Sequence, residues 1–136
     1  MNEIVYRELD FSKSAILNLY SDNEWTLYTD NPIKLFDGIQ NSLYCYAAYD
    51  NKKLVGLIRV VGDDNTIIYI QDILILKEYQ NKKIGTKLIS HIISKYQDVR
   101  QIILTTDNSV MQKKFYEKNN FQNFTDANLI GFKLKK

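Results

Sequence analysis

The sequence predicts an α/β fold in which helices pack on a mixed sheet with an antiparallel centre. Turn signals at residues 50–52 and 62–65 separate three consecutive segments of strand character, which predicts an antiparallel meander. Apolar residues with helical spacing occur both before and after this meander. A continuous apolar run at residues 73–76, typical of a strand buried on both faces, leads through a basic loop into one of these helices.

The first third of the chain predicts one strand and two helices. Residues 4–9 have strand character, and Asp10 or Ser12 is suited to cap the helix that follows. The aromatic-rich segment 22–29 is predicted to be a loop. Pro32 marks the start of the second helix, because proline is tolerated in a first helical turn. The strands of the meander are expected at residues 43–49, 54–61 and 66–76.

The rest of the chain continues the alternation of helices and strands. We expect a helix at residues 83–96, a strand at 101–105, a helix at 109–118 and two short β segments at 121–124 and 129–134. No internal repeat, low-complexity segment or linker interrupts this order. The sequence therefore predicts one domain over residues 1–136.

Composition limits the classes of function. A net charge of +2 is too small to indicate a nucleic-acid or membrane partner. A single cysteine, Cys45, permits no disulfide within the chain, and no apolar run reaches the ~20 residues of a membrane span. Charged residues within the first ten positions argue against a signal peptide. We therefore expect a soluble, cytoplasmic protein.

The loop at residues 77–83 predicts an anion site. Free backbone N–H groups, the positive end of a helix dipole and several lysines converge where the loop enters the helix, an arrangement suited to phosphate. The loop is not a Walker A sequence, since Gly85 is followed by Thr86 and Lys87 in the wrong order. It has one glycine, whereas a dinucleotide fingerprint requires three.

Residues 80–85, Gln-Asn-Lys-Lys-Ile-Gly, resemble the acetyl-CoA loop of the GCN5-related N-acetyltransferases (GNAT), Gln/Arg-x-x-Gly-x-Gly/Ala. Lys83 stands where the family has its first glycine, which lets a phosphate approach the backbone. A lysine with a negative φ still donates its N–H and adds a charge, so we expect weaker binding. The predicted order of elements matches the family fold from end to end.

A second motif supports the resemblance. Residues 115–121, Phe-Tyr-Glu-Lys-Asn-Asn-Phe, are similar to the family's Phe/Leu-Tyr-Glu-Lys-x-Gly-Phe, which ends a helix. Asn120 occupies the glycine position and is suited to a left-handed helix cap. Family members often have an asparagine seven residues before the tyrosine. Here Ser109 occupies that position and Asn108 precedes it, and either is a candidate for contact with pantetheine.

The resemblance implies a single-domain GNAT fold whose strands at 66–76 and 101–105 splay apart to admit the pantetheine arm. It also implies acetyl transfer from acetyl-CoA to a primary amine of a small molecule or peptide, by direct attack in a ternary complex. No metal, nucleic acid or membrane is implied, and a homodimer is one option. The implied acetyl-CoA contacts are Ile73, Leu74, Ile75, Gln80, Asn81, Lys82, Lys83, Ile84, Gly85, Thr86, Asn108, Ser109, Phe115 and Tyr116, with the Ile73 N–H as the candidate oxyanion donor.

The resemblance also implies the proton-transfer groups. Tyr116 corresponds to the general acid that protonates the leaving thiolate, against the alternative of a half-buried helix aromatic. Asp72 is the candidate general base. Alternation along a strand directs Gln71 and Asp72 to opposite faces, so only one should face the substrate. If Asp72 instead pairs with Arg59 or a neighbouring strand, the base is a water chain or there is none.

The acceptor side is expected to involve Trp25, Tyr28, Arg59 and Gln71. Trp25 and Tyr28 lie in the loop that covers the acceptor cleft in the family, and they form either a substrate wall or a lid on the core. Arg59 is a candidate for binding a substrate carboxylate or for an ion pair with Asp72. Acidic residues in the loop hint at a cationic acceptor.

Two rival functions come from other classes. A CoA-binding module with little or no catalysis is favoured by Lys83 in place of glycine and Gln71 in place of a carboxylate. A phosphate or nucleic-acid binder would use the lysines, but the low net charge argues against it. His91 has no second ligand near it in the sequence, so a metal site is not expected, and Cys45 is predicted to be a core residue.

Overall fold

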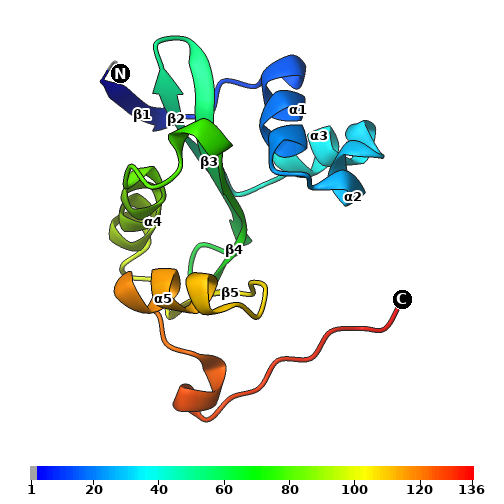
Figure 1. The fold of residues 1–136 in the computed structure, drawn as a ribbon. Coiled ribbons are helices and arrows are strands. Elements are labelled where there is room, and N and C mark those ends of the chain that lie inside the picture. Colours follow the sequence, from blue (N-terminus) through cyan, green and yellow to red (C-terminus); the bar gives the residue numbers. More distant parts are fainter. Residues whose placement is uncertain (1–2) are drawn as a thin grey trace. The chain divides into compact units, whose positions relative to one another are not determined.

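Five strands in the order β1-β2-β3-β4-β5 form one sheet, antiparallel throughout except for the parallel pair β4–β5. The computed structural model describes residues 3–136 and divides the chain into two units, residues 1–105 and 106–136. The sheet belongs to the first unit (Figure 1). Its strands are β1 (Ile4–Glu8), β2 (Tyr44–Asp50), β3 (Lys53–Gly62), β4 (Ile67–Ile75) and β5 (Gln101–Leu104).

Helices cover both faces of this sheet. Figure 1 shows α4 on one face and the group α1 to α3 on the other. Residues 54–60 of the central strand β3 are all buried, as expected for a strand covered on both faces. The helices are α1 (Lys13–Asp22), α2 (Thr26–Thr29), α3 (Pro32–Gln40) and α4 (Ile84–Lys95), with a 3-10 turn η1 (Lys77–Tyr79) before α4.

The predicted caps and turns are confirmed. Ser12 caps α1 by accepting from the Ala15 N–H, and the side chain of Asn31 caps α3, which has Pro32 in its first turn. Asn51 turns the β2–β3 hairpin with a φ of 55°. In the β3–β4 turn, the Asp63 carboxylate accepts from the Thr66 hydroxyl and from three backbone N–H groups, and these hydrogen bonds hold its pKa well below the usual range.

The segment predicted as a loop at 22–29 contains a single helical turn, α2. Four residues are too few to show helical periodicity in the sequence, so the pattern could not reveal this turn. Among the described residues, no helix has the length and apolar character to cross a membrane.

Gly56 brings α4 close to the sheet. A Cβ at this position of β3 would lie 2.9 Å from a side-chain carbon of Ile75 and 3.2 Å from one of Ile84. The missing side chain of Gly56 therefore leaves room on β3 for the side chains of Ile75 and of Ile84, the first residue of α4.

The second unit contains helix α5 (Val110–Lys118) and a 3-10 turn η2 (Phe124–Ala127). Ser109 caps the start of α5, and Asn120 ends it in the predicted left-handed conformation, with a φ of 72°. The Phe121 N–H donates to the carbonyl of Tyr116, and the Asn120 N–H donates to that of Glu117. These two bonds form a Schellman motif, and the Tyr116 and Phe121 rings make its usual apolar contact, 5.9 Å between centroids.

The two short β segments predicted at 121–124 and 129–134 are wrong for the single chain. In the first segment, residues 121–123 have no regular secondary structure and Phe124 begins η2, and residues 129–134 have no regular secondary structure either. A strand is stable only when a neighbour accepts its backbone hydrogen bonds, and the second unit contains a helix and a 3-10 turn but no strand. Strand-like alternation in a sequence cannot supply that partner.

The predicted splay of two neighbouring strands is confirmed. β5 pairs with β4 only at residues 67–70, and β4 continues to Ile75 beyond the last pair, Ile70 with Leu104. The antiparallel pairing of β4 with β3 continues over this stretch. One edge of β4 is therefore without a neighbouring strand from residue 71 onward.

Lys83, the residue before α4, adopts a left-handed conformation with a φ of 66°. The expectation that Lys83 has a negative φ is therefore wrong. The loop keeps a glycine-like backbone at the position where the family has glycine. A left-handed conformation costs a non-glycine residue about 1–2 kcal/mol. Lys83 therefore carries this free-energy cost at the residue immediately before α4.

Replacing Lys83 by glycine is expected to raise the free energy of unfolding by about 0.5–1 kcal/mol, because glycine adopts positive φ without strain but loses more entropy on folding. Chemical denaturation measures this change. Lys82→Gly is the matched control, since the φ of Lys82 is not positive, and this substitution should destabilise the protein. Destabilisation by both variants would contradict the strain at Lys83.

Candidate active site

The free edge of β4 presents main-chain groups that β3 does not use. The Leu76 N–H donates to the carbonyl of Val55, 2.9 Å away, so residues 74 and 76 direct their backbone groups toward β3. Antiparallel ladders alternate, and Ile73 and Ile75 therefore direct their N–H and C=O groups the other way. No β5 residue pairs with Ile73 or Ile75 in the described chain. The predicted oxyanion donor, the Ile73 N–H, belongs to this unpaired edge.

Two side chains bind the carbonyl oxygen of Ile75 at this edge. Gln80 Nε2 and Asn23 Nδ2 each donate to it at 3.1 Å. Gln80 begins the predicted acetyl-CoA loop, so this bond connects the loop to the end of β4. Asn23 also donates to the Leu19 carbonyl and so connects the end of α1 to the same point.

The start of α4 offers unpaired N–H groups. The first backbone bond of the helix runs from the Lys87 N–H to the Lys83 carbonyl, and the Lys83 side chain makes no capping bond in the described structure. The N–H groups of Ile84, Gly85 and Thr86 therefore have no partner within the helix. They lie at the positive end of a helix of 12 residues.

Exposed lysines add positive charge around this helix start. Lys82 and Lys83 are exposed, and the Lys82 ammonium lies 6.0 Å from the centre of the Tyr79 ring. The Lys53 ammonium lies 5.6 Å from the same ring and pairs with Glu78 at 2.7 Å. Backbone N–H groups, the helix dipole and these ammonium groups together form an environment suited to an anion.

A β-bulge brings Gln71 and Asp72 to the same point. Arg59 of β3 pairs with Asp72 while Val60 pairs with Ile70, so Gln71 has no partner and forms the bulge. Gln71 Nε2 donates to the Tyr28 hydroxyl at 3.1 Å, and this hydroxyl donates to Asp72 Oδ1 at 3.0 Å. The expectation that these two side chains point to opposite faces is therefore wrong, because a bulge interrupts strict alternation.

Asp72 is buried in an ion pair with Arg59. Its Oδ2 accepts from Arg59 Nε at 2.8 Å and from the Tyr20 hydroxyl at 2.8 Å, while its Oδ1 accepts from Tyr28. The side chains of Arg59 and Asp72 are 8% and 2% exposed. Of the two roles considered for this carboxylate, these contacts correspond to the structural ion pair, while its role as general base stays a prediction.

Arg59 uses its remaining donors to join α3 and the loop after it to the sheet. Its Nη1 donates to the Gly38 carbonyl at 3.3 Å and to Ser42 Oγ at 3.2 Å, and its Nη2 lies 3.5 Å from the Tyr28 hydroxyl. Burial opposes the charge of Arg59, but the Asp72 carboxylate outweighs it and raises the pKa of the guanidinium. A guanidinium so engaged has little left to offer a substrate carboxylate.

The phenols around Asp72 are held protonated. Burial, followed by the charge of Asp72, raises the pKa of Tyr20 far above its usual value. Burial also raises the pKa of Tyr28, while the hydrogen bond from Gln71 partly opposes this increase. Both hydroxyls therefore act as hydrogen-bond donors to the carboxylate at neutral pH.

Three aromatic rings close over this network. The Tyr20 ring is fully buried and makes edge contacts with Trp25 and Tyr28, at centroid distances of 5.7 and 5.4 Å. Trp25 and Tyr28 are half-buried and lie 5.9 Å apart. They cover the core beneath them and also present part of their surface to solvent, so the geometry is compatible with either role considered for the pair.

The remaining predicted residues lie in the second unit. Asn108 is exposed, and Ser109 serves as the cap of α5. Phe115 and Tyr116 are half-buried, with ring centroids 5.1 Å apart. Burial raises the pKa of the Tyr116 phenol to about 12. Their roles toward pantetheine and the thiolate stay predictions.

The sequence did not identify Tyr20 and Asn23 as parts of the site. Tyr20 lies among the buried residues of α1, and the signal that could have identified its role is its hydroxyl, which requires a partner when buried. Asn23 is the residue that follows α1, at the start of the segment that the sequence predicts to be a loop. No local pattern indicates that its amide reaches a strand 52 residues further along the chain.

His91 and Cys45 lie outside the site, and their surroundings indicate structural roles. His91 stacks on Tyr46 with centroids 3.6 Å apart and lies 3.0 Å from the Tyr44 hydroxyl, and burial and then Lys95 lower its pKa. In the described residues, no three His, Cys, Asp or Glu side chains gather as a metal site would require. Cys45 is buried, as predicted, and burial raises the pKa of its thiol.

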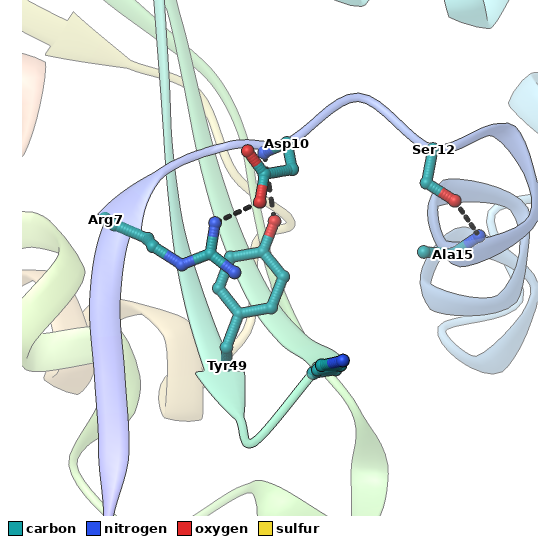
Figure 2. A pocket seen from close by; sticks show the side chains of 6 residues that line it. Arg7, Asp10, Ser12, Ala15 and Tyr49 are labelled. Carbon is teal, nitrogen blue, oxygen red and sulfur yellow. Dashed lines mark hydrogen bonds and ion pairs between the residues drawn. The ribbon is translucent and has the colours of Figure 1, made fainter.

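A hollow of about 330 Å³ lies elsewhere, at the junction of β1 and α1 (Figure 2). The Arg7 guanidinium stacks 3.9 Å from the centre of the Tyr49 ring and pairs with Asp10, and the Asp10 N–H donates to the Tyr49 hydroxyl. These groups satisfy one another, and none of the predicted site residues lines the hollow. Its lining is Arg7, Asp10, Ser12, Ala15, Tyr49 and Lys52.

Comparison with known proteins bears on this geometry. A solved structure of a GNAT-family acetyltransferase from Streptococcus pneumoniae is 28% identical, with a TM-score of 0.87 over 100% of this chain and 98% of its own. A search among curated proteins gives no match.

Two solved enzymes with named substrates share the fold at 17% identity. Glucosamine-6-phosphate N-acetyltransferase from Arabidopsis thaliana has a TM-score of 0.71 over 99% of this chain and 98% of its own. An aminoglycoside acetyltransferase from an uncultured soil metagenomic sample, solved with sisomicin, has a TM-score of 0.72 over 98% and 96%. At this identity, they show the fold alone.

The family itself is established by the sequence match. A model of the acetyltransferase (GNAT) domain matches residues 41–123, which is more than half of the chain. This range includes the free edge of β4, the loop before α4 and the motif that ends α5. The chain therefore belongs to the GNAT acetyltransferase family.

Proposed function

We propose that the chain is an N-acetyltransferase that moves an acetyl group from acetyl-CoA to a primary amine of a small molecule or peptide. The observation that carries this proposal is the unpaired edge of β4, joined through Gln80 to a loop that ends at an uncapped helix start. We further propose that residues 1–136 act as one domain, since the family match runs across the division at residue 105.

The residues fit acetyl-CoA as a cosubstrate. The backbone groups of Ile73 and the N–H of Ile75, which do not pair with a neighbouring strand, suit the amides of a pantetheine arm and the thioester carbonyl. The N–H groups at the start of α4, with Lys82 and Lys83 beside them, suit a diphosphate. Acetyl-CoA supplies the activated acetyl group. The chain's task is to orient this group and to stabilise the negative charge that develops on its carbonyl oxygen.

Tyr116 is proposed as the proton donor to the leaving thiolate. A phenol with a pKa of about 12 is a weak acid beside a thiol of about 8.5, so a complete transfer would be uphill by about 5 kcal/mol. The transfer must therefore occur as the carbon–sulfur bond breaks and charge develops on sulfur. The same high pKa keeps the phenol protonated at every physiological pH.

The base that receives the proton from the amine is proposed to be a water chain. Asp72 has three donors on its two oxygens and is buried, so its contacts favour a role in holding Tyr28 and Gln71 in place. Gln71 is exposed and has no basic group. An amine that enters already neutral needs only solvent to accept the second proton.

A small-molecule amine is the favoured acceptor. Two relatives of the same fold carry the names of enzymes for glucosamine-6-phosphate and aminoglycosides, which are small amines. The acidic residues of the segment 22–29 support a cationic acceptor less than the sequence suggested. Asp22 accepts a hydrogen bond from the Lys77 N–H, and Glu24 pairs with the Lys77 ammonium, so both carboxylates already have partners. We place the protein in the cytoplasm, where a single free thiol such as Cys45 stays reduced.

A CoA-binding module with little or no catalysis is the second candidate. The contacts of Asp72 favour it, since both oxygens of this buried carboxylate already accept hydrogen bonds from Arg59, Tyr20 and Tyr28. An assay of thiol release with a panel of amines separates the two functions. Release of CoA with any amine in the panel supports the enzyme, and binding without release supports the module.

Acetyl-CoA at about 100 times its dissociation constant is expected to stabilise the folded protein by about 2.7 kcal/mol, seen as a rise of several degrees in melting temperature. Adenosine is the control, because it lacks both the diphosphate and the pantetheine arm. Absence of a shift with millimolar acetyl-CoA would contradict both the enzyme and the binding module.

Tyr116→Phe is expected to lower kcat by about 100-fold or more while the acetyl-CoA melting shift remains, because only the proton donor is lost. In the parent protein, kcat/KM should rise with pH as the amine loses its proton. It should show no decline at any pH up to about 11, since Tyr116 stays protonated. Thiol-release rates over a pH series measure both effects. A descending limb near pH 8–9 that disappears in the Phe variant would contradict the pKa of about 12.

Asp72→Asn is expected to destabilise the protein by about 3–5 kcal/mol, because it leaves Arg59 buried and without its counter-charge. Denaturant titration measures the loss, and the double variant Arg59→Met/Asp72→Leu should regain most of it. Glu78→Gln, which removes the exposed pair with Lys53, is the matched control and should change stability little. A stable Asp72→Asn protein that binds acetyl-CoA but has lost turnover would instead identify Asp72 as the base.

A further inference from the structure

The loop that enters α4 contains two residues in the left-handed conformation. Asn81 and Lys83 have φ values of 63° and 66°, and neither is a glycine. The 3-10 turn η1 that leads into this loop has only three residues, Lys77–Tyr79, too few to be stable without tertiary contacts. A strained backbone persists where the surrounding structure determines it, so the contacts of η1 decide the shape of this helix entrance.

Tyr79 connects η1 to the hairpin between β2 and β3. Its hydroxyl donates to Asp50 Oδ2 at 2.5 Å. This hydrogen bond, followed by burial, raises the pKa of the Tyr79 phenol, so the hydroxyl stays a donor at neutral pH. The ammonium groups of Lys53 in the hairpin and Lys82 in the loop lie 5.6 and 6.0 Å from the centre of the same ring.

Asp50 is a rigid anchor for this contact. It is the last residue of β2 and pairs with Ile4 of β1 and with Lys53 of β3, so its backbone is held from both sides. Its Oδ2 accepts from Tyr79, while its Oδ1 is buried and has no hydrogen-bond partner within residues 3–136. A buried carboxylate oxygen without a partner costs stability. A role in holding Tyr79 therefore explains this aspartate better than a contribution to stability does.

The two ion pairs of η1 are weaker anchors. Glu78 pairs with Lys53 at 2.7 Å and Lys77 pairs with Glu24 at 3.3 Å, and all four side chains are at least half exposed. Solvent screens such pairs, so they hold the turn loosely. Tyr79 is half-buried and directly precedes the loop. Its bond to the hairpin is therefore the contact best placed to fix where residues 80–83 begin.

We propose that Asp50 is a positioning residue for acetyl-CoA. Acting through the Tyr79 hydroxyl, its carboxylate holds residues 80–83 so that the N–H groups at the start of α4 face the diphosphate. Neither side chain is among the groups proposed to act on the acetyl group, so the pair controls the affinity for acetyl-CoA. This inference rests on the proposed function, in which the loop binds the diphosphate of acetyl-CoA.

Calorimetric titration of acetyl-CoA into the full chain tests the proposal. Tyr79→Phe keeps the ring and loses the hydroxyl, and it should raise the Kd about 10-fold. Tyr49→Phe is the matched control, because it removes a phenol hydroxyl one residue before Asp50 that accepts from the Asp10 N–H instead. Its Kd should stay within about 2-fold of the parent value.

Two substitutions of Asp50 separate position from charge. Asp50→Ala and Asp50→Asn both remove a negative charge, which by itself should favour a diphosphate equally in both variants. Only the asparagine keeps an oxygen that can accept from Tyr79, so Asp50→Ala should bind acetyl-CoA about 10-fold more weakly than Asp50→Asn. Equal Kd values for the two variants would overturn the proposal, because the carboxylate would then act through its charge alone.

The titrations also separate this inference from the proposed function. A parent protein that does not bind millimolar acetyl-CoA contradicts both. A parent that binds acetyl-CoA, with a Tyr79→Phe Kd within about 2-fold of its own, overturns the positioning role and leaves the proposed function in place. A loss of affinity that Tyr49→Phe shares overturns the positioning role too, because general destabilisation would then explain both variants.

Discussion

The end of pairing between β4 and β5 is the constraint on which the rest of the candidate site depends. β4 continues to Ile75 after its last pair at Ile70, and the alternation of an antiparallel ladder directs the backbone of Ile73 and Ile75 into the space that β5 leaves. Unpaired backbone groups require partners, and within residues 3–136 side-chain donors reach this edge only at the Ile75 carbonyl. A ligand with amide and carbonyl groups would suit the rest of this edge, and this match is the basis for proposing acetyl-CoA.

The buried network around Asp72 holds the strand end in place. One carboxylate receives an arginine and two phenols from three different elements, α1, α2 and β3, and the arginine reaches on to α3. Because removal of one partner from a buried ion pair leaves an uncompensated charge, these elements are coupled. The bulge at Gln71 is the local distortion that brings β4 into this network, and it places an exposed amide beside the same phenol.

The start of α4 combines strain with an unsatisfied helix terminus. Lys83 adopts a left-handed conformation that glycine adopts at no cost, and the helix that follows has no side-chain cap from this residue. Backbone strain of this kind persists when the surrounding structure determines it. Gly56 contributes to that determination, because it allows Ile84 to pack closely on the sheet. The loop therefore keeps a left-handed backbone at residue 83, where the family has glycine.

The sequence by itself determined the order of the elements, their caps and turns, and the two motifs of the family, because local hydrogen bonds and side-chain periodicity specify these features. Ser12, Asn31 and Asn120 have their predicted roles for this reason. Only the tertiary structure decided that Gln71 and Asp72 meet at Tyr28, that Tyr20 and Asn23 belong to the site, and that residues 129–134 have no strand partner in one chain. Each of these features depends on groups far apart in the sequence, and a bulge, a buried hydroxyl or a missing neighbour leaves no local pattern from which it could be predicted.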